Sequence, residues 1–280
     1  MSSATAPADQ YFLGYRPAEQ RRLQRQAEHL ASEAAWLLDR VGPLDGRRVV
    51  ELGPGPRGYL DTLSERVGPN GSVIGVERSA DTVALARLLI GRRGLSNVEL
   101  VHGDARFTGL PATAFDLATA RLVLVNVPRP EQIVAESVRL VRPGGIVAFH
   151  EADALTMACD PPLDAWTELR SLLNQYAEQN GIDLFVGRRL PRLLRDAGLV
   201  DVRARPIVYL DEPGHPRRSL LPHFVDNLKE RLLAQGLVAR GDLDHLQASV
   251  RRHLEDRETL VVSHLFVQAW GRKPGPRTES

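Results

Sequence analysis

A glycine-rich segment at residues 51–58 has the residue types and the spacing to hold a nucleotide-like ligand. It follows a short apolar run, and Gly53, Gly55 and Gly58 match the pattern G-x-G-x-x-G. A buried strand that ends in an acidic residue, Glu51, and turns through glycines into a helix places such a ligand at the carboxyl end of the strand. The alternative is a strand-to-helix turn that binds nothing, because a lone match of this pattern is weak evidence.

The prolines of this segment distinguish between two classes of ligand. A dinucleotide presents a doubly negative pyrophosphate that backbone N–H groups at a helix N-terminus must hold, and Pro54 and Pro56 have no N–H group. The carboxylate of Glu51 would also repel the phosphates. S-adenosylmethionine has no phosphate but carries an ammonium and a sulfonium, which a nearby carboxylate attracts. The segment therefore favours S-adenosylmethionine over a nicotinamide or flavin dinucleotide.

Two further acidic residues follow the next two expected strands. Glu77 ends the second strand, where a carboxylate can accept hydrogen bonds from both ribose hydroxyls, and Asp104 follows the third, where it can accept from an adenine amino group. Either residue alone is more often a solvated loop acid or a helix cap. Because the carboxyl ends of parallel strands meet at one edge of a sheet, acids after three successive strands predict a three-point cofactor site.

As a set, several segments resemble the motifs of class I S-adenosylmethionine-dependent methyltransferases, in the group similar to the ubiquinone/menaquinone biosynthesis C-methyltransferases. They are residues 51–55, 76–77, 103–105, 120–124 and 140–145. The resemblance covers residues 46–151 and implies a seven-stranded sheet with an antiparallel last strand beside the fifth. It also implies the contacts with the cofactor. Glu51 and Gly53 would lie near the methionine moiety, with Gly55 in the same turn, and Glu77 with its neighbour Arg78 would lie at the ribose. Asp104 and Ala105 would contact the adenine, and Arg121 would lie between cofactor and substrate.

One departure from this resemblance concerns the substrate. Related sequences often carry a histidine after the fourth strand, where this chain has Asn126-Val127-Pro128. We therefore expect a different substrate or a different way of handling it. Asn126, Tyr15 and His223 are the residues that we place on the substrate side.

The sequence shows no catalytic triad and no metal site, which methyl transfer does not require. Transfer from a sulfonium depends mainly on alignment and the exclusion of water, and a base is needed only for some acceptors. The candidate bases are His150 and Glu151, at the end of the fifth strand. The alternative is a satisfied polar pair that closes the strand. For His264 we expect a packing or surface role.

The chain alternates β-rich runs with helical segments, which predicts a parallel sheet with helices on both faces. Strands are expected at residues 48–51, 72–77, 98–102, 115–120, 144–150, 202–210 and 260–270. Helices are expected at residues 17–41, 59–67, 80–93, 130–141, 161–179 and 188–197, and twice within 222–255. The fold class is therefore α/β and Rossmann-like, with an N-terminal helical lid and a C-terminal helical insertion.

This pattern divides the chain into five parts. They are a disordered start with a helical lid (1–45), the cofactor-binding core (46–212), a helical insertion over the substrate (213–256), the final strand of the core (257–272) and a disordered tail (273–280). We expect Tyr11 to close over the cofactor as part of the lid. The alternative is a hydrophobic staple for the helix that follows.

Composition limits the classes of function. With 280 residues, 43% of them hydrophobic, and a net charge of +1, the chain reads as an ordinary soluble protein without overall attraction to nucleic acid or anionic membrane. Its one cysteine excludes an internal disulfide. It shows neither a signal peptide nor an apolar run of roughly 20 residues. We expect a cytoplasmic protein with a small-molecule substrate, and the oligomeric state is open, with a homodimer as one option.

Together these features predict a methyltransferase that uses S-adenosylmethionine and acts on a small, apolar or aromatic acceptor in bacterial secondary metabolism. One alternative is an enzyme that keeps the fold and the cofactor but catalyses a non-methylating reaction such as a cyclisation, since fold does not fix function. A less favoured alternative is an NAD(P)-dependent oxidoreductase.

Overall fold

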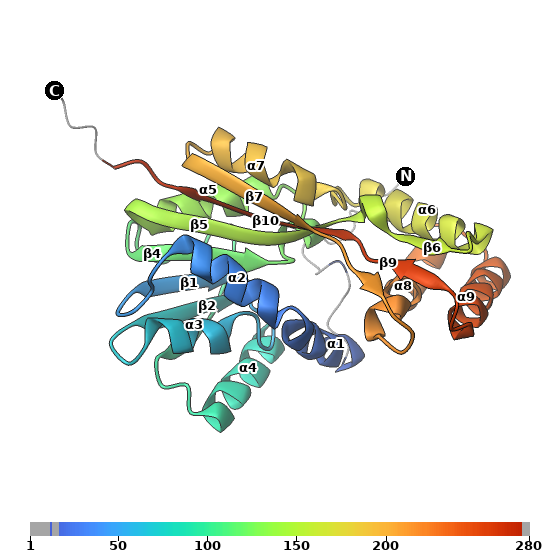
Figure 1. Cartoon of the computed structure of the whole chain (residues 1–280), viewed down its shortest axis with the longest axis horizontal. Helices are drawn as coiled ribbons and strands as arrows, with labels where there is room; N and C mark the ends of the chain where they lie inside the picture. Colours follow the sequence, from blue (N-terminus) through green and yellow to red (C-terminus); the bar gives the residue numbers. More distant parts are fainter. Residues whose placement is uncertain (1–11, 13–16, 276–280) are drawn as a thin grey trace, which may run out of the picture.

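Seven strands form one mixed sheet through the larger part of the protein (Figure 1). The computed structural model describes residue 12 and residues 17–275. Side by side, the strands are β3 (Val98–His102), β2 (Ser72–Glu77), β1 (Arg48–Leu52), β4 (Phe115–Arg121), β5 (Val141–Asp153), β10 (Leu265–Arg272) and β7 (Val200–Ile207). The first five run parallel, and β10 is antiparallel to both β5 and β7. The predicted Rossmann-like sheet with an antiparallel last strand is confirmed.

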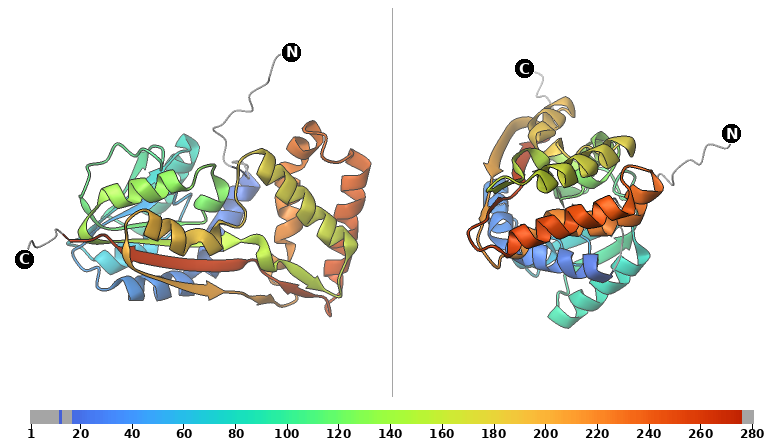
Figure 2. Two further views of the ribbon diagram at one scale, coloured as in Figure 1. Left: turned by 90° about the horizontal axis from the view of Figure 1, so that it is seen from above. Right: turned by 90° about the vertical axis from the view of Figure 1, so that its right-hand side faces the viewer.

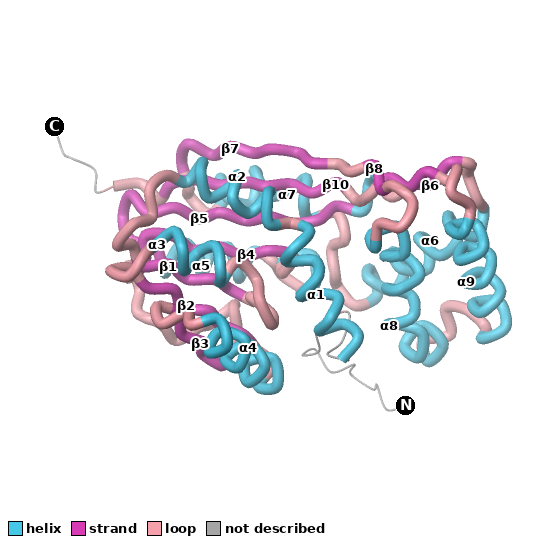
Figure 3. Tube along the Cα trace, turned by 60° about the horizontal axis from the view of Figure 1, so that its bottom comes forward, coloured by secondary structure: helices cyan, strands magenta, loops and turns pink. Residues whose placement is uncertain are grey.

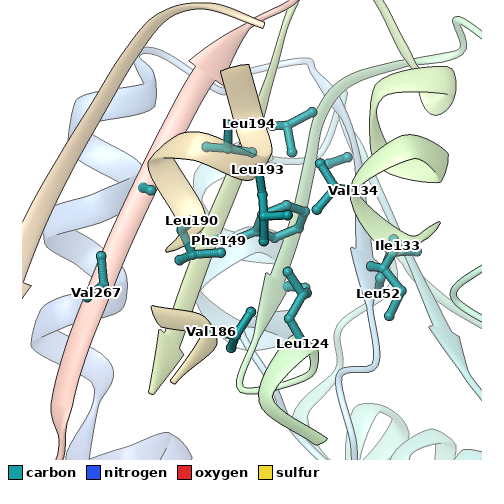
Figure 4. Close-up of a cluster of buried hydrophobic side chains, with 14 of the residues drawn as sticks. Leu52, Leu124, Ile133, Val134, Phe149, Val186, Leu190, Leu193, Leu194 and Val267 are labelled. Carbon is teal, nitrogen blue, oxygen red and sulfur yellow. The ribbon is translucent and has the colours of Figure 1, made fainter. Parts of the chain in front are cut away.

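Helices cover both faces of this sheet. One face packs against α2 (Ala31–Val41), α3 (Leu60–Val67) and α4 (Ala80–Arg93). The other packs against α5 (Glu131–Leu140) and α7 (Val186–Asp196), whose leucines and valines lie over Phe149 in Figure 4. The central strands β1 and β4 are buried on both faces, and apolar residues stand at adjacent positions such as Val49 and Val50 because both faces are covered.

A second, helical part lies beyond the carboxyl ends of the strands (Figures 1 and 2). It consists of α6 (Asp164–Gln179), α8 (Leu220–Ala234) and α9 (Arg240–Glu255), which share one apolar core. A small sheet in the order β6 (Ala158–Asp160), β9 (Leu260–Val262) and β8 (Leu210–Asp211) joins it to the main sheet. We call these elements the helical part. It includes α6, which the sequence placed within the core segment 46–212.

Three elements expected from the sequence are each divided in the structure. The strand expected at 202–210 becomes β7 in the main sheet and β8 in the small one. The strand expected at 260–270 is broken at Ser263 and His264, because β9 joins the small sheet whereas β10 stays in the main one. The helix expected at 17–41 is divided at Leu30 into α1 (Pro17–His29) and α2. Figure 3 shows α1 between the strand ends and the helical part. Of the helices in the described ranges, none combines the length and apolar character that a bilayer crossing requires.

Candidate cofactor and acceptor site

A large cavity lies where the carboxyl ends of the parallel strands face α1 and the helical part. The sheet side of its lining comes from the turn after β1, the end of β2, and the segments after β3 and β4. The opposite side comes from α6, α8 and the break between β9 and β10. Of the predicted site residues, those that line it are Gly53, Gly55, Glu77, Arg78, Asp104, Ala105, Arg121 and Asn126.

The turn after β1 brings bare backbone to the cavity. Gly53 and Gly55 have φ angles of +65° and +60°, a left-handed conformation that glycine adopts without strain. A Cβ atom at Gly53 would lie 2.7 Å from Val123 Cγ2, so a side chain has no room there. The Gly53 N–H donates to the Val76 carbonyl at 2.8 Å, which ties the turn to the end of β2.

Glu77 joins this turn to the next one. Its Oε2 accepts from the Gly55 N–H at 3.0 Å, and its Oε1 accepts from the Ser79 N–H at 3.0 Å. Burial raises the pKa of this carboxyl, while the two backbone hydrogen bonds act to lower it. Because Glu77 also lines the cavity, the remaining lone pairs of its carboxylate can accept from ligand hydroxyls.

Glu51 lies behind the turn and does not line the cavity. Both of its oxygens accept from the Tyr59 N–H, at 2.8 and 3.0 Å. Gly58 leaves room for this carboxylate, since a Cβ atom there would overlap it. Burial raises the pKa of Glu51 to about 8. The geometry therefore gives Glu51 a role in shaping the turn, and its predicted contact with the methionine moiety stays a prediction.

Asp104 and Arg121 line the cavity at its two flanks. The Arg106 guanidinium lies 2.6 Å from Asp104 Oδ2, and this hydrogen bond lowers the pKa of the Asp104 carboxyl. Arg121 donates from Nη2 to the Gly58 carbonyl at 2.8 Å and stacks over the Tyr59 ring at 4.6 Å. Arg106, which also lines the cavity, was not singled out from the sequence, although it follows the aspartate by two positions.

The two candidate bases at the end of β5 do not reach the cavity. Glu151 is fully buried and accepts from three consecutive backbone N–H groups, Val123 at 2.9 Å, Leu124 at 3.0 Å and Val125 at 3.1 Å. Burial raises its pKa to about 7. His150, also fully buried, has its Nδ1 atom 3.2 Å from the Tyr59 hydroxyl. This placement fits the polar pair that closes the strand, and it lends no support to a role as a base.

Burial lowers the pKa of His150 to about 3 and that of His264 to about 4. In the unfolded chain each imidazole takes up a proton near pH 6.5, so the folded state loses stability as the pH falls below that value. Glu51 and Glu151 have the opposite effect on stability, because burial raises their pKa values. Their contribution to the stability of the folded state is complete below about pH 4.5. It is lost as the pH rises toward 7 for Glu151 and toward 8 for Glu51.

The His150→Gln variant isolates one of these contributions. Between pH 7 and pH 5 the wild type should lose about 2 kcal/mol more of its free energy of unfolding than the variant does. Urea unfolding of both proteins at the two pH values measures this difference, in which the two glutamates cancel. Parallel pH profiles would show that His150 is protonated in the folded state as readily as in the unfolded one.

The residues expected on the substrate side do not all lie at the same cavity. Asn126 lines the cavity, and its Nδ2 donates to the Leu122 carbonyl at 2.7 Å. His223, on α8, lines a smaller neighbouring cavity instead. Tyr11 and Tyr15 lie outside the described residues. The proposed lid contact of Tyr11 and the substrate contact of Tyr15 therefore stay predictions.

Three cavity residues of the helical side were missed as site candidates. Arg170 and Asn174 lie one turn apart on α6, and His264 lies in the break between β9 and β10. The helical period of α6 indicates a polar face but not which part of it meets the cavity. His264 was expected within a continuous strand, and only the break exposes its ring to the cavity.

Known sequences with methyltransferase descriptions match this chain. Residues 50–149 match the family model described as a methyltransferase domain. An uncharacterized 37.1 kDa protein in transposon TN4556 of Streptomyces fradiae is 32% identical over 219 residues, which are 76% of this chain and 61% of that protein. A demethylmenaquinone methyltransferase of Geobacillus kaustophilus is 28% identical over 191 residues, which are 62% of this chain and 79% of that enzyme.

Solved structures share the fold. Phosphoethanolamine N-methyltransferase 2 of Haemonchus contortus, solved in complex with S-adenosyl-L-methionine, superposes with a TM-score of 0.56 at 18% identity, over 87% of this chain and 52% of that one. The 4+2 cyclase SpnF superposes with a TM-score of 0.54 at 20% identity, over 87% of this chain and 81% of that one. At these identities the likeness concerns the fold alone.

The sheet order, the antiparallel last strand and the glycine turn at the carboxyl edge define a protein of the class I methyltransferase fold. The chain carries a methyltransferase domain, matched over residues 50–149, and it is similar to the demethylmenaquinone methyltransferases. The family predicted from the motifs is thus confirmed, and with it the enzyme class and the cofactor at the level of the family. The chain spans 61% of the Streptomyces relative and 52% of the nematode enzyme.

Proposed function

We propose that this protein binds S-adenosylmethionine and transfers its methyl group to a small acceptor with a largely apolar body. The observation that carries the proposal is the state of the backbone donors in the glycine turn. Gly53 donates to Val76 and Gly55 donates to Glu77, while Pro54 and Pro56 have no N–H group. No donor of residues 53–56 is left for a pyrophosphate. A cofactor without phosphate fits this turn better than a dinucleotide, whose pyrophosphate would find no free donor before residue 57.

The carboxylates at the cavity support the same cofactor. Glu77 and Asp104 face the cavity from the ends of β2 and β3, where they suit the ribose hydroxyls and the adenine amino group. Glu51 lies behind the turn and, with its pKa raised by burial to about 8, is mostly protonated at neutral pH, so it contributes little negative potential to the cavity. The turn, Glu77 and Asp104 are therefore the residues that we assign to the cofactor, with Arg78, Ala105 and Arg121 beside them.

The acceptor would occupy the helical side of the same cavity. Its apolar lining consists of Met157, Leu173, Leu184, Leu221 and Phe224. When bound, the cofactor supplies an activated methyl group, to which an acceptor lone pair forms a bond while the electrons of the C–S bond pass to sulfur. The protein's part is to align the acceptor and to exclude water.

His264 is the group that we assign to a hydrogen bond with the acceptor. Its low pKa keeps the imidazole neutral at neutral pH, so one ring nitrogen can accept from an acceptor hydroxyl. The ring packs between Phe224, 6.4 Å away, and Phe266, 4.8 Å away, measured between centroids. These contacts hold the imidazole at the cavity wall. A setting in bacterial secondary metabolism stays a prediction.

Two measurements test the proposed function. Calorimetric titration should show binding of S-adenosylmethionine and of S-adenosylhomocysteine but not of NADPH. Incubation with methyl-deuterated S-adenosylmethionine and a panel of hydroxylated aromatic acids and quinols should then yield a product that carries the labelled methyl group in mass spectrometry. Binding of NADPH alone would overturn the cofactor assignment. A product of unchanged mass, formed only with the cofactor bound, would indicate cyclisation or another isomerisation.

A further inference from the structure

Arg170 presents a positive charge to the acceptor side of the cavity without an acidic partner. Its guanidinium donates from Nη2 to the Ala154 carbonyl at 3.2 Å, and no other hydrogen bond or ion pair involves this side chain within residues 17–275. The side chain is half-buried, and burial lowers its pKa. Since a guanidinium has five N–H donors, most of the hydrogen-bonding capacity of Arg170 is unused.

The other arginines at the cavity have partners in the protein. Arg22 lies 2.7 Å from Glu19 Oε1, and Arg106 lies 2.6 Å from Asp104 Oδ2. Arg121 donates to a backbone carbonyl and stacks on Tyr59, and Arg78 is also engaged. Holding a cation partly out of water without a counter-ion costs free energy. The bland alternative is that Arg170 extends its head group to solvent along the helix.

A second polar side chain with unused hydrogen-bonding capacity lies beside Arg170. Asn174, one turn further along α6, lines the same cavity, and its amide makes no hydrogen bond with any residue in the described ranges. Leu173 on the same helix and Leu221 on α8 supply apolar lining next to this pair. By contrast, Glu77 and Asp104 on the cofactor side are already bonded within the protein. Arg170 and Asn174 thus form a pair of neighbouring polar side chains with unused donors on the acceptor side, whereas on the cofactor side the Oε1 atom of Gln20 is an unpaired acceptor.

We propose that Arg170 binds a carboxylate of the acceptor, with Asn174 as its neighbour, so that the acceptor is a small apolar monocarboxylic acid. The carboxylate is the anchored group and takes no part in the transfer. A planar guanidinium pairs with a carboxylate through two parallel hydrogen bonds, whereas a phosphate dianion would call for a second cation without a partner. This assignment rests on the proposed function, because it places the acceptor in the cavity shared with the cofactor.

The test uses protein saturated with S-adenosylhomocysteine and three carboxylates, benzoate, 2-naphthoate and decanoate, each paired with its neutral amide. Calorimetry should show that the wild type prefers at least one carboxylate to its amide. Arg170→Gln should weaken binding of that carboxylate about tenfold or more and leave the amide unaffected. Arg170→Lys should retain part of the preference, because lysine keeps the charge but lacks the planar fork. Arg252→Gln, an exposed position on α9, controls for net charge.

The outcomes separate this proposal from the one on which it rests. Failure of the wild type to bind S-adenosylhomocysteine would refute the cofactor assignment itself. Normal binding of S-adenosylhomocysteine without a preference for any of the carboxylates would refute the anchor alone. An Arg170→Gln variant that keeps the wild-type preference would do the same, provided that its cofactor affinity shows it to be folded.

Discussion

Replacement of Glu77 by alanine should weaken the binding of S-adenosylhomocysteine by about 5- to 150-fold, the equivalent of about 1–3 kcal/mol. The carboxylate accepts from the Gly55 and Ser79 N–H groups at 3.0 Å each. Alanine would leave both donors unpaired and would remove the acceptor that we assign to the ribose hydroxyls. Calorimetric titration of the purified variant measures the loss, and thermal unfolding shows how much of it comes from a disordered turn.

Two further variants make this result specific. Glu77→Gln keeps one oxygen that can accept from Gly55 or Ser79 but loses the charge, so we expect an affinity between those of the wild type and Glu77→Ala. Glu99→Ala, on the exposed side of the neighbouring strand β3, removes an acid of the same type away from the cavity and should leave affinity unchanged. An unchanged affinity in Glu77→Ala would refute the assignment of this carboxylate to the cofactor.

The cofactor side of the site was largely predictable from the sequence. Parallel strands end at one edge, so Glu77 and Asp104, each placed at a strand end, had to lie near the glycine turn. The direction in which Glu51 points was not predictable. Its carboxylate points toward the start of α3, where the Tyr59 N–H donates to it. That contact depends on how the helix packs behind the turn.

The acceptor side was not predictable for a different reason. The small sheet pairs β9 with β6 and β8 over only two or three residues each, and these segments are far apart in the sequence. Such short pairings leave no periodic signal in the sequence. They interrupt the expected last strand and thereby turn His264 to the cavity. In the same way, the contacts of α6 with α8 and α9 decide that Arg170 faces inward.

Replacement of Glu151 by alanine should lower the free energy of unfolding by about 3 kcal/mol or more. The three backbone N–H groups of Val123, Leu124 and Val125 donate to this one carboxylate at 2.9–3.1 Å, and it is fully buried. Without it these three donors would lose their shared acceptor, two of them at buried positions. The same segment carries Val123, whose side chain occupies the space that a Cβ atom at Gly53 would need. We therefore expect weaker cofactor binding together with the loss of stability.

Urea unfolding, calorimetry and the assay for transfer of the labelled methyl group, applied to Glu151→Ala, Glu151→Gln and the exposed control Glu178→Ala, distinguish a structural role from a chemical one. Glutamine retains one accepting oxygen, so its loss of stability should be smaller than that of alanine, and Glu178→Ala should behave as the wild type. A carboxylate that acted as a catalytic base would give the opposite pattern, with lost turnover at an unchanged free energy of unfolding. That pattern would support Glu151 as the base that its place at the end of β5 suggests.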